Sequence, residues 1–182
     1  MNPIIFTTVC LALAAATCID LRSQRIPNAL TIPTALAALA FHALNQGPAG
    51  FWFSAGGLGL GFGLMLAPFL FGVMGGGDLK LMAAVGAWLG PQAVFTAFLA
   101  TSIAGGLYAL AVLAQRRDVL RSVFLRFTSA LYATAGTGEF HYRPAPGAET
   151  LPRLCYGLAI SLGTLAVMIH RVLEHGWLGQ AW

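Results

Sequence analysis

The sequence predicts an all-α, polytopic integral membrane protein with about six transmembrane helices. Hydrophobic residues make up 58% of its 182 residues and charged residues only 9%. Its mean hydropathy is +0.76, well above what a water-soluble domain of this size carries. We therefore expect one transmembrane domain over residues 1–182, surrounded by the lipid bilayer.

Six apolar segments account for most of the chain. A helix needs roughly 20 apolar residues to cross a bilayer. The fourth segment is short, because Gly90-Pro91 ends it after 11 residues, and at ~1.5 Å per residue it covers about half of the ~30 Å hydrocarbon core. The predicted spans are Pro3–Ile19, Ala29–Leu44, Phe51–Val73, Leu79–Leu89, Ala93–Ala114 and Leu154–Val172.

The basic residues indicate the orientation of these spans. If all six segments cross, the loops at about 20–28, 74–80 and 115–153 share one side and hold every basic residue except Arg171. Positive loops are typically cytoplasmic, so both chain ends are predicted outside the cytoplasm. Without the fourth span, the arginine-rich 115–153 loop would lie outside, which the same tendency disfavours. Four tryptophans fall near the predicted outer ends, as interfacial anchors do: Trp52, Trp88, Trp177 and Trp182.

Two of the six acidic residues lie at the edges of these spans. Asp20 follows the first apolar run, and Asp78 precedes the fourth. Ionisable residues are costly there and are read as functional by default. Because both carboxylates are predicted at the cytoplasmic side, they are candidates for an acid/base pair. The short fourth span also predicts that Asp78 lies at some depth, beside a water-filled cleft.

The residues around the aspartates have structural readings as well. Gly75, Gly76 and Gly77 carry no Cβ, so the backbone before Asp78 can approach a neighbouring chain closely, as a loop that admits an extended peptide must. Pro27 stops the preceding helix, and Asn28 is a good N-cap for a helix starting at Ala29. By itself this second pattern is only a helix boundary.

The basic neighbours of the aspartates leave two interpretations open. Lys80 either biases the carboxylate pair or anchors the topology, and Arg22 and Arg25 pose the same choice. Anchoring is the preferred interpretation for all three. In the third span, the small-xxx-small pairs Gly57/Gly61 and Gly59/Gly63 favour helix packing within the chain over docking of a substrate helix.

The two motifs together resemble the prepilin peptidases, which are Gly-x-Gly-Asp aspartic proteases. The resemblance rests on Asp20-x-x-x-x-Arg-Ile-Pro-Asn28, on Gly75-Gly-Gly-Asp-Leu-Lys-Leu81 and, more loosely, on the late segment Pro152–Gly163. It implies that Asp20 and Asp78 are the catalytic pair and that Gly75–Gly77 and Lys80 form a supporting loop. The implied substrate is a prepilin or pseudopilin with a short basic leader, a glycine before the cut and an apolar helix after it. Pilus assembly machinery is a further candidate partner, and the implied location is the bacterial cytoplasmic (inner) membrane.

The chain also departs from the long bacterial members of that family. Those members carry paired Cys-x-x-Cys motifs and methylate the new N-terminus, whereas Cys10, Cys18 and Cys155 form no such pair. The chain therefore resembles the short monofunctional peptidase of tight-adherence (Flp) pili, and no methyltransferase activity is expected. The cysteines are predicted to be buried small hydrophobes. Four histidines share no metal-site spacing and are predicted to be interfacial or solvated: His42, His141, His170 and His175. No metal or cofactor is expected.

Adjacent carboxylates explain how such a pair would work. Two of them cannot both ionise cheaply, so one stays protonated while the other activates a water. The alternative function is a non-enzymatic membrane protein, such as a small proton-coupled transporter that uses the same aspartates, or an inactive assembly factor with the same fold. The first motif and the glycine-rich approach to Asp78 favour the peptidase. A nucleic-acid role is not expected, because topology already explains the net charge of +4.

Overall fold

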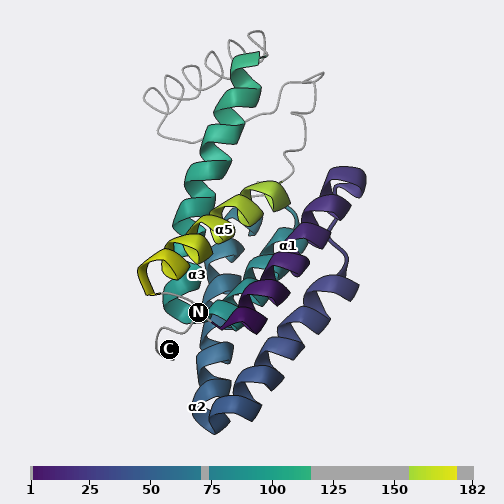
Figure 1. Ribbon diagram of the computed structural model, residues 1–182. Coiled ribbons are helices and arrows are strands. Elements are labelled where there is room, and N and C mark those ends of the chain that lie inside the picture. Colours follow the sequence, from purple (N-terminus) through teal and green to yellow (C-terminus); the bar gives the residue numbers. More distant parts are fainter. Residues whose placement is uncertain (1, 71–73, 116–155, 176–182) are drawn as a thin grey trace, which may run out of the picture. The chain divides into compact units, whose positions relative to one another are not determined.

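The computed structural model describes residues 2–70, 74–115 and 156–175, and the backbone there is helical apart from short connections. The helices are α1 (Pro3–Ser23), α2 (Asn28–Leu70), α3 (Gly76–Gln115) and α5 (Tyr156–His175) (Figure 1). Within the described residues, these four helices are long and apolar enough to cross a membrane. The predicted all-α membrane fold is confirmed. The number of six spans and the location of both termini stay predictions.

The contacts between residues divide the chain into two compact units. The first contains Met1–Gly105 and Cys155–Trp182, and the second contains Gly106–Leu154. Most of the second unit, including residues 116–153 of the predicted cytoplasmic loop, lies outside the described residues. The candidate site described below lies entirely in the first unit. The expectation of one domain stays a prediction.

Helices α2 and α3 each contain a break at a glycine. Gly47 has φ 63° and ψ −147°, and Gly90 has φ 79° and ψ 174°. A proline follows each glycine, and a proline has no backbone N–H to continue the helix. The two arms of α2 run in opposite directions (Figure 1). The predicted break at Gly90-Pro91 is therefore present. The second predicted segment and the described part of the third, which ends at Leu70, lie on the two arms of α2.

The first arm of α3 is the buried centre of the first unit. Every residue from Leu81 to Gly90 is buried, as expected for a helix that is apolar on all sides. Other core side chains come from the remaining helices: Ile5, Val9 and Leu13 of α1, Met65 of α2, and Ile160 and Met168 of α5. A short helix of this kind is protected from lipid by its neighbours.

Glycines let α2 closely approach the first arm of α3 (residues 76–90), called the central arm below. A Cβ added at Gly57 would overlap the Gly86 carbonyl, and one added at Gly61 would lie 2.5 Å from the Met82 carbonyl oxygen. Gly59 and Gly63 face open space, with no atom within 4 Å of an added Cβ. Packing within the chain therefore explains Gly57/Gly61, as predicted, and not Gly59/Gly63.

Because the helix breaks at Gly90, backbone carbonyls near the end of the central arm lack their usual helical N–H donors. The Ala87 carbonyl would normally accept from the residue four positions later, but that residue is Pro91, which has no N–H. The buried Ser54 hydroxyl of α2 donates to the Ala87 carbonyl instead, at 2.8 Å. This bond satisfies a polar group that neither lipid nor the helix could satisfy.

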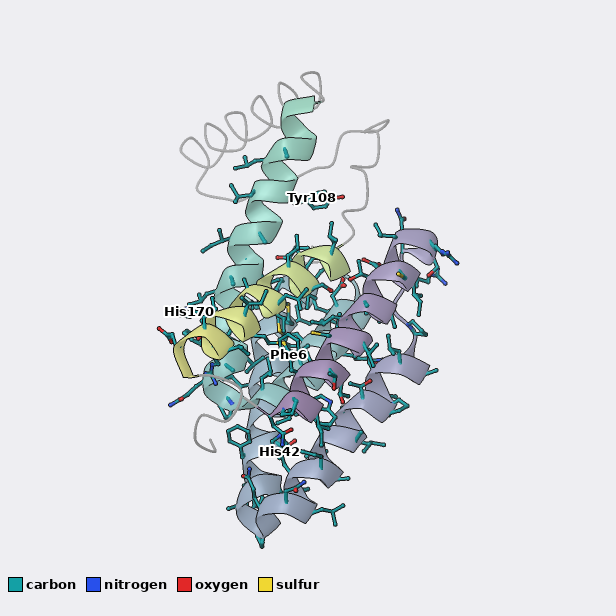
Figure 2. The ribbon with its side chains drawn as sticks, viewed as in Figure 1. Phe6, His42, Tyr108 and His170 are labelled. Carbon is teal, nitrogen blue, oxygen red and sulfur yellow. The ribbon has the colours of Figure 1, made fainter. Side chains whose placement is uncertain are left out.

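His42 and Trp88 extend the same arrangement and correct two predictions. His42 Nε2 donates to the Trp88 carbonyl at 3.1 Å, and Trp88 Nε1 donates to the Thr34 carbonyl at 3.0 Å. Figure 2 shows His42 near the turn between the two arms of α2. His42 is 0% exposed and Trp88 is 3% exposed. They are neither solvated nor interfacial anchors, because both join α2 to the end of the central arm.

Candidate active site

Asp20 lies in the last turn of α1, where the helix is about to end. Gln24 follows the helix in the left-handed region, with φ 51°, and its N–H donates to the Asp20 carbonyl at 2.8 Å. This is a common helix C-cap geometry. The Asp20 side chain is 6% exposed. The end of α1 thus carries a buried carboxyl group.

Asp78 lies in the first turn of α3 and is 8% exposed. The Gly75 N–H donates to Asp78 Oδ2 at 3.1 Å, and the Asp78 N–H donates to the Gly75 carbonyl at 3.2 Å. These two bonds close a small loop around the carboxyl. Gly76 fits beside the ring of Phe69, whose nearest atom would lie 3.4 Å from an added Cβ. The glycine run therefore shapes the backbone that holds Asp78.

The fold brings the two carboxyl groups into the same region. Asp20 and Asp78 are 58 positions apart in sequence, yet they are near enough for a direct Coulombic interaction. Tyr156, at the start of α5, also interacts electrostatically with Asp78. The end of α1 and the starts of α3 and α5 therefore surround one polar centre in a largely apolar bundle.

The two sequence motifs are in contact. A Cβ added at Gly77 would lie 2.9 Å from Ile26 Cβ and 3.1 Å from the Ile26 nitrogen and oxygen. Lys80 Nζ donates to Asn28 Oδ1 at 2.8 Å. The absence of a side chain at Gly77 allows the Ile26 backbone to approach. The Lys80 bond then ties the first turn of α3 to the first residue of α2.

The start of α2 differs by one residue from the sequence prediction. The helix begins at Asn28, and the Pro27 carbonyl accepts from the N–H groups of Leu30 and Thr31 at 3.1 and 3.4 Å. Asn28 was predicted to be the N-cap of a helix starting at Ala29. Instead it is the first helical residue, and its side chain accepts the hydrogen bond from Lys80. Pro27 marks the boundary as predicted.

Gly157 is a site residue that was not predicted from the sequence. Its N–H, in the first turn of α5, donates to Asp20 Oδ2 at 3.1 Å. One turn further along, Ser161 Oγ and Thr17 Oγ1 form a hydrogen bond at 2.7 Å that joins α5 to α1. The available signal was the late segment containing Tyr156-Gly157, which contributed to the family resemblance.

No metal centre is evident in the described ranges, where no three His, Cys, Asp or Glu side chains gather. The expectation of no metal and no cofactor stays a prediction. The cysteine prediction was wrong for Cys18, which is exposed, whereas Cys10 is half-buried and packs against the hydrophobic core. Cys18 faces outward because α1 packs only part of its circumference against α2 and α5. Cys155 lies outside the described residues. His170 lies on the exposed face of α5 (Figure 2), with Nε2 3.4 Å from Glu174 Oε1.

The fold and the site define a class before any comparison is made: an α-helical membrane protein with two buried carboxyl groups drawn from separate helices. The sequence model of the type IV leader peptidase family matches residues 7–110, which is more than half of the chain and includes both aspartates. The chain belongs to the type IV leader peptidase family.

Several relatives carry the name prepilin leader peptidase/N-methyltransferase. The one from Burkholderia pseudomallei (strain 1026b) is 38% identical over 105 residues, covering 53% of this chain and 33% of the relative. Those from Aeromonas salmonicida (strain A449) and Escherichia coli (strain K12) are 36% and 34% identical over 110 and 115 residues. These alignments cover 57% and 58% of this chain, and 38% and 50% of the relatives.

The matched stretch therefore spans a third to a half of the relatives' length. No solved structure matches the chain at the same level of significance. Association with tight-adherence pili stays a prediction.

Proposed function

We propose that this protein is a membrane-embedded aspartic endopeptidase that removes the short basic leader of prepilins or pseudopilins. The observation that carries the proposal is the meeting of Asp20 and Asp78, two buried carboxyl groups from separate helices, in a chain of this family. The relatives' names supply the substrate class.

The reaction follows from the chemistry of a shared proton. One aspartate is ionised and removes a proton from a water molecule, whose oxygen attacks the scissile carbonyl carbon. The protonated aspartate donates a hydrogen bond to the carbonyl oxygen as negative charge develops there. The C–N bond then breaks, and the leaving amine takes a proton from the pair. Water ends as part of the leader's new carboxyl group, and no acyl-enzyme forms. The two aspartates act as one titrating unit.

The backbone holds each carboxyl before the substrate arrives. Asp20 Oδ2 accepts from the Gly157 N–H, and Asp78 Oδ2 accepts from the Gly75 N–H, both at 3.1 Å. Each carboxyl thus has one anchored oxygen, which restricts rotation of the side chain. Such preorganisation limits the loss of freedom when the reacting groups come together.

The surroundings of the pair fit cleavage at the cytoplasmic face. Arg22, Arg25 and Lys80 all lie within a few residues of the aspartates, at the end that positive-inside topology assigns to the cytoplasm. Because the first arm of α3 is too short to cross the bilayer and is buried by other helices, we expect its start to lie below the membrane surface. A leader in the cytoplasm, followed by an apolar helix in the bilayer, would present the scissile bond at that depth. The exposed Gly75 leaves the approach to Asp78 free of side-chain bulk.

Co-expression with a prepilin tests the proposal. The wild type should shorten the prepilin and create a new N-terminus after the leader glycine, whereas Asp20→Asn and Asp78→Asn should lose cleavage while still inserting into the membrane. Glu174→Gln is the matched control, since it makes the same chemical change at an exposed carboxylate on α5. It should cleave like the wild type.

The mass of the cleaved product, measured in the same experiment, separates the peptidase from the other possible functions. The relatives' names include N-methyltransferase activity, and we expect a product without the added mass of a methyl group. Substantial cleavage by either Asp→Asn variant would contradict the aspartate pair. An inserted wild type that cleaves none of several prepilins would favour the proton-coupled transporter or the inactive assembly factor.

A further inference from the structure

The first turn of α5 contacts Asp20 of the proposed catalytic pair, although it belongs to neither of the two aspartate motifs. Gly157 donates its backbone N–H to Asp20 Oδ2 at 3.1 Å across 137 positions of sequence. Tyr156, its neighbour, interacts electrostatically with Asp78. One turn of helix therefore binds Asp20 and lies close enough to Asp78 for a Coulombic interaction. The N–H groups at the start of a helix have no partners within the helix, so Gly157 is free to hold a carboxylate.

Position 157 has room for the Asp20 carboxyl only because it has no side chain. A Cβ added there would lie 2.9 Å from Asp20 Oδ2 and 3.3 Å from Asp20 Cβ and Cγ. The backbone of Gly157 is not in the left-handed region, so backbone conformation does not require a glycine here. The requirement is the space that the carboxyl occupies. Any larger residue must push the Asp20 side chain away from its present position.

A second polar contact fixes the register of α5 against α1. Thr17 and Ser161 are joined through their hydroxyl oxygens at 2.7 Å, and Ser161 Oγ also donates to the Leu13 carbonyl at 3.4 Å. Thr17 precedes Asp20 by about one helical turn, and Ser161 follows Gly157 by about one turn. Rotation or sliding of α5 would break these bonds together with the bond to Asp20. The Gly157 N–H is therefore delivered to Asp20 by a fixed helix pair.

From these contacts we propose that Gly157 is a positioning residue for Asp20, and that the first turn of α5 is a third structural element of the catalytic centre. This inference rests on the peptidase function proposed above. Gly157 need not touch the substrate: its N–H and its lack of a side chain hold one oxygen of Asp20, so that the other oxygen meets the water and Asp78. The α1–α5 hydroxyl contact maintains this arrangement.

A glycine on another helix gives a matched test. Gly157→Ala places a methyl group against the Asp20 carboxyl, whereas Gly59→Ala in α2 adds one where no atom lies within 4 Å. We expect Gly157→Ala to lower kcat about 10- to 100-fold with KM nearly unchanged, because a misplacement near 1 Å has effects of that order. Gly59→Ala should leave kcat per folded molecule unchanged.

The rates are measured on purified, monodisperse protein in lipid, with a prepilin that the wild type cleaves. Wild-type kcat and KM for Gly157→Ala would overturn the inference, as would an equal loss of kcat in Gly59→Ala. If Gly157→Ala does not fold, Ser161→Ala provides the test, since it removes the hydroxyl contact without adding bulk. It should lower kcat several-fold with KM unchanged, and an unchanged kcat would overturn the inference. An inactive wild type would instead contradict the proposed function itself, and this inference with it.

Discussion

The hydrogen bond from Ser54 to Ala87 predicts a stability loss that can be worked out from the structure. Ser54 is 0% exposed, and its hydroxyl donates at 2.8 Å to a carbonyl whose usual helical donor position is occupied by Pro91. Ser54→Ala leaves that carbonyl without this donor in a buried site. An unsatisfied buried polar group costs about 1–3 kcal/mol, while hydrogen bonds between membrane helices average ~0.6 and reach ~1.7 kcal/mol. We expect a loss of about 1–2 kcal/mol in the free energy of unfolding.

Ser102→Ala is the control for this measurement. The Ser102 hydroxyl also donates to a carbonyl at 2.8 Å, but it is exposed and bonds Phe98 within its own helix, where the Phe98 carbonyl already has a backbone donor. Its removal should change the free energy of unfolding by less than about 0.5 kcal/mol. Both variants are unfolded reversibly in mixed micelles and followed by far-ultraviolet circular dichroism. Equal losses in the free energy of unfolding would refute the claim that the Ser54 bond replaces the missing donor at the end of the first arm of α3.

Two further predictions concern the contact between the motifs. Gly77→Ala forces Ile26 away from the start of α3 and should lower kcat about tenfold or more, whereas Gly63→Ala adds a Cβ where there is no neighbour within 4 Å and should leave cleavage unchanged. Comparable losses in both would contradict the close approach as the cause. Lys80→Met and Asn28→Ala should each lower the cleavage rate a few-fold, and the double variant should be no slower than the worse single one, because the two side chains share one bond. Additive losses would show that they act separately.

The parts of the fold that could be predicted from the sequence are those that depend on hydropathy or on a recognisable motif. The break at Gly90 was predictable because proline follows a glycine inside an apolar run. The meeting of Asp20 and Asp78 was predictable because each lies at a span edge on the side that the basic loops assign to the cytoplasm. Hydropathy alone did not show that the fourth segment is the buried centre. That follows from its packing, and in particular from Gly57 and Gly61.

The missed features depend on helix rotation and on backbone donors. The segment containing His42 is apolar on all sides, so its sequence does not indicate which face packs on α3, and His42 was predicted at an interface although it is buried. Trp88 was predicted to be an interfacial anchor, and it is buried, for the same reason. Gly157 was missed because the group it contributes to Asp20 is a backbone N–H, which every residue except proline carries.

If Asp20 and Asp78 act as one catalytic unit, single-turnover cleavage by the double variant will reveal it. Wild type, Asp20→Asn, Asp78→Asn and the double variant are reconstituted in liposomes with one prepilin, and the rate of appearance of the new N-terminus is measured. Groups that work as a unit are strongly non-additive when removed. We expect the double variant to be no slower than either single variant. Losses that multiply, or an active single variant, would contradict it.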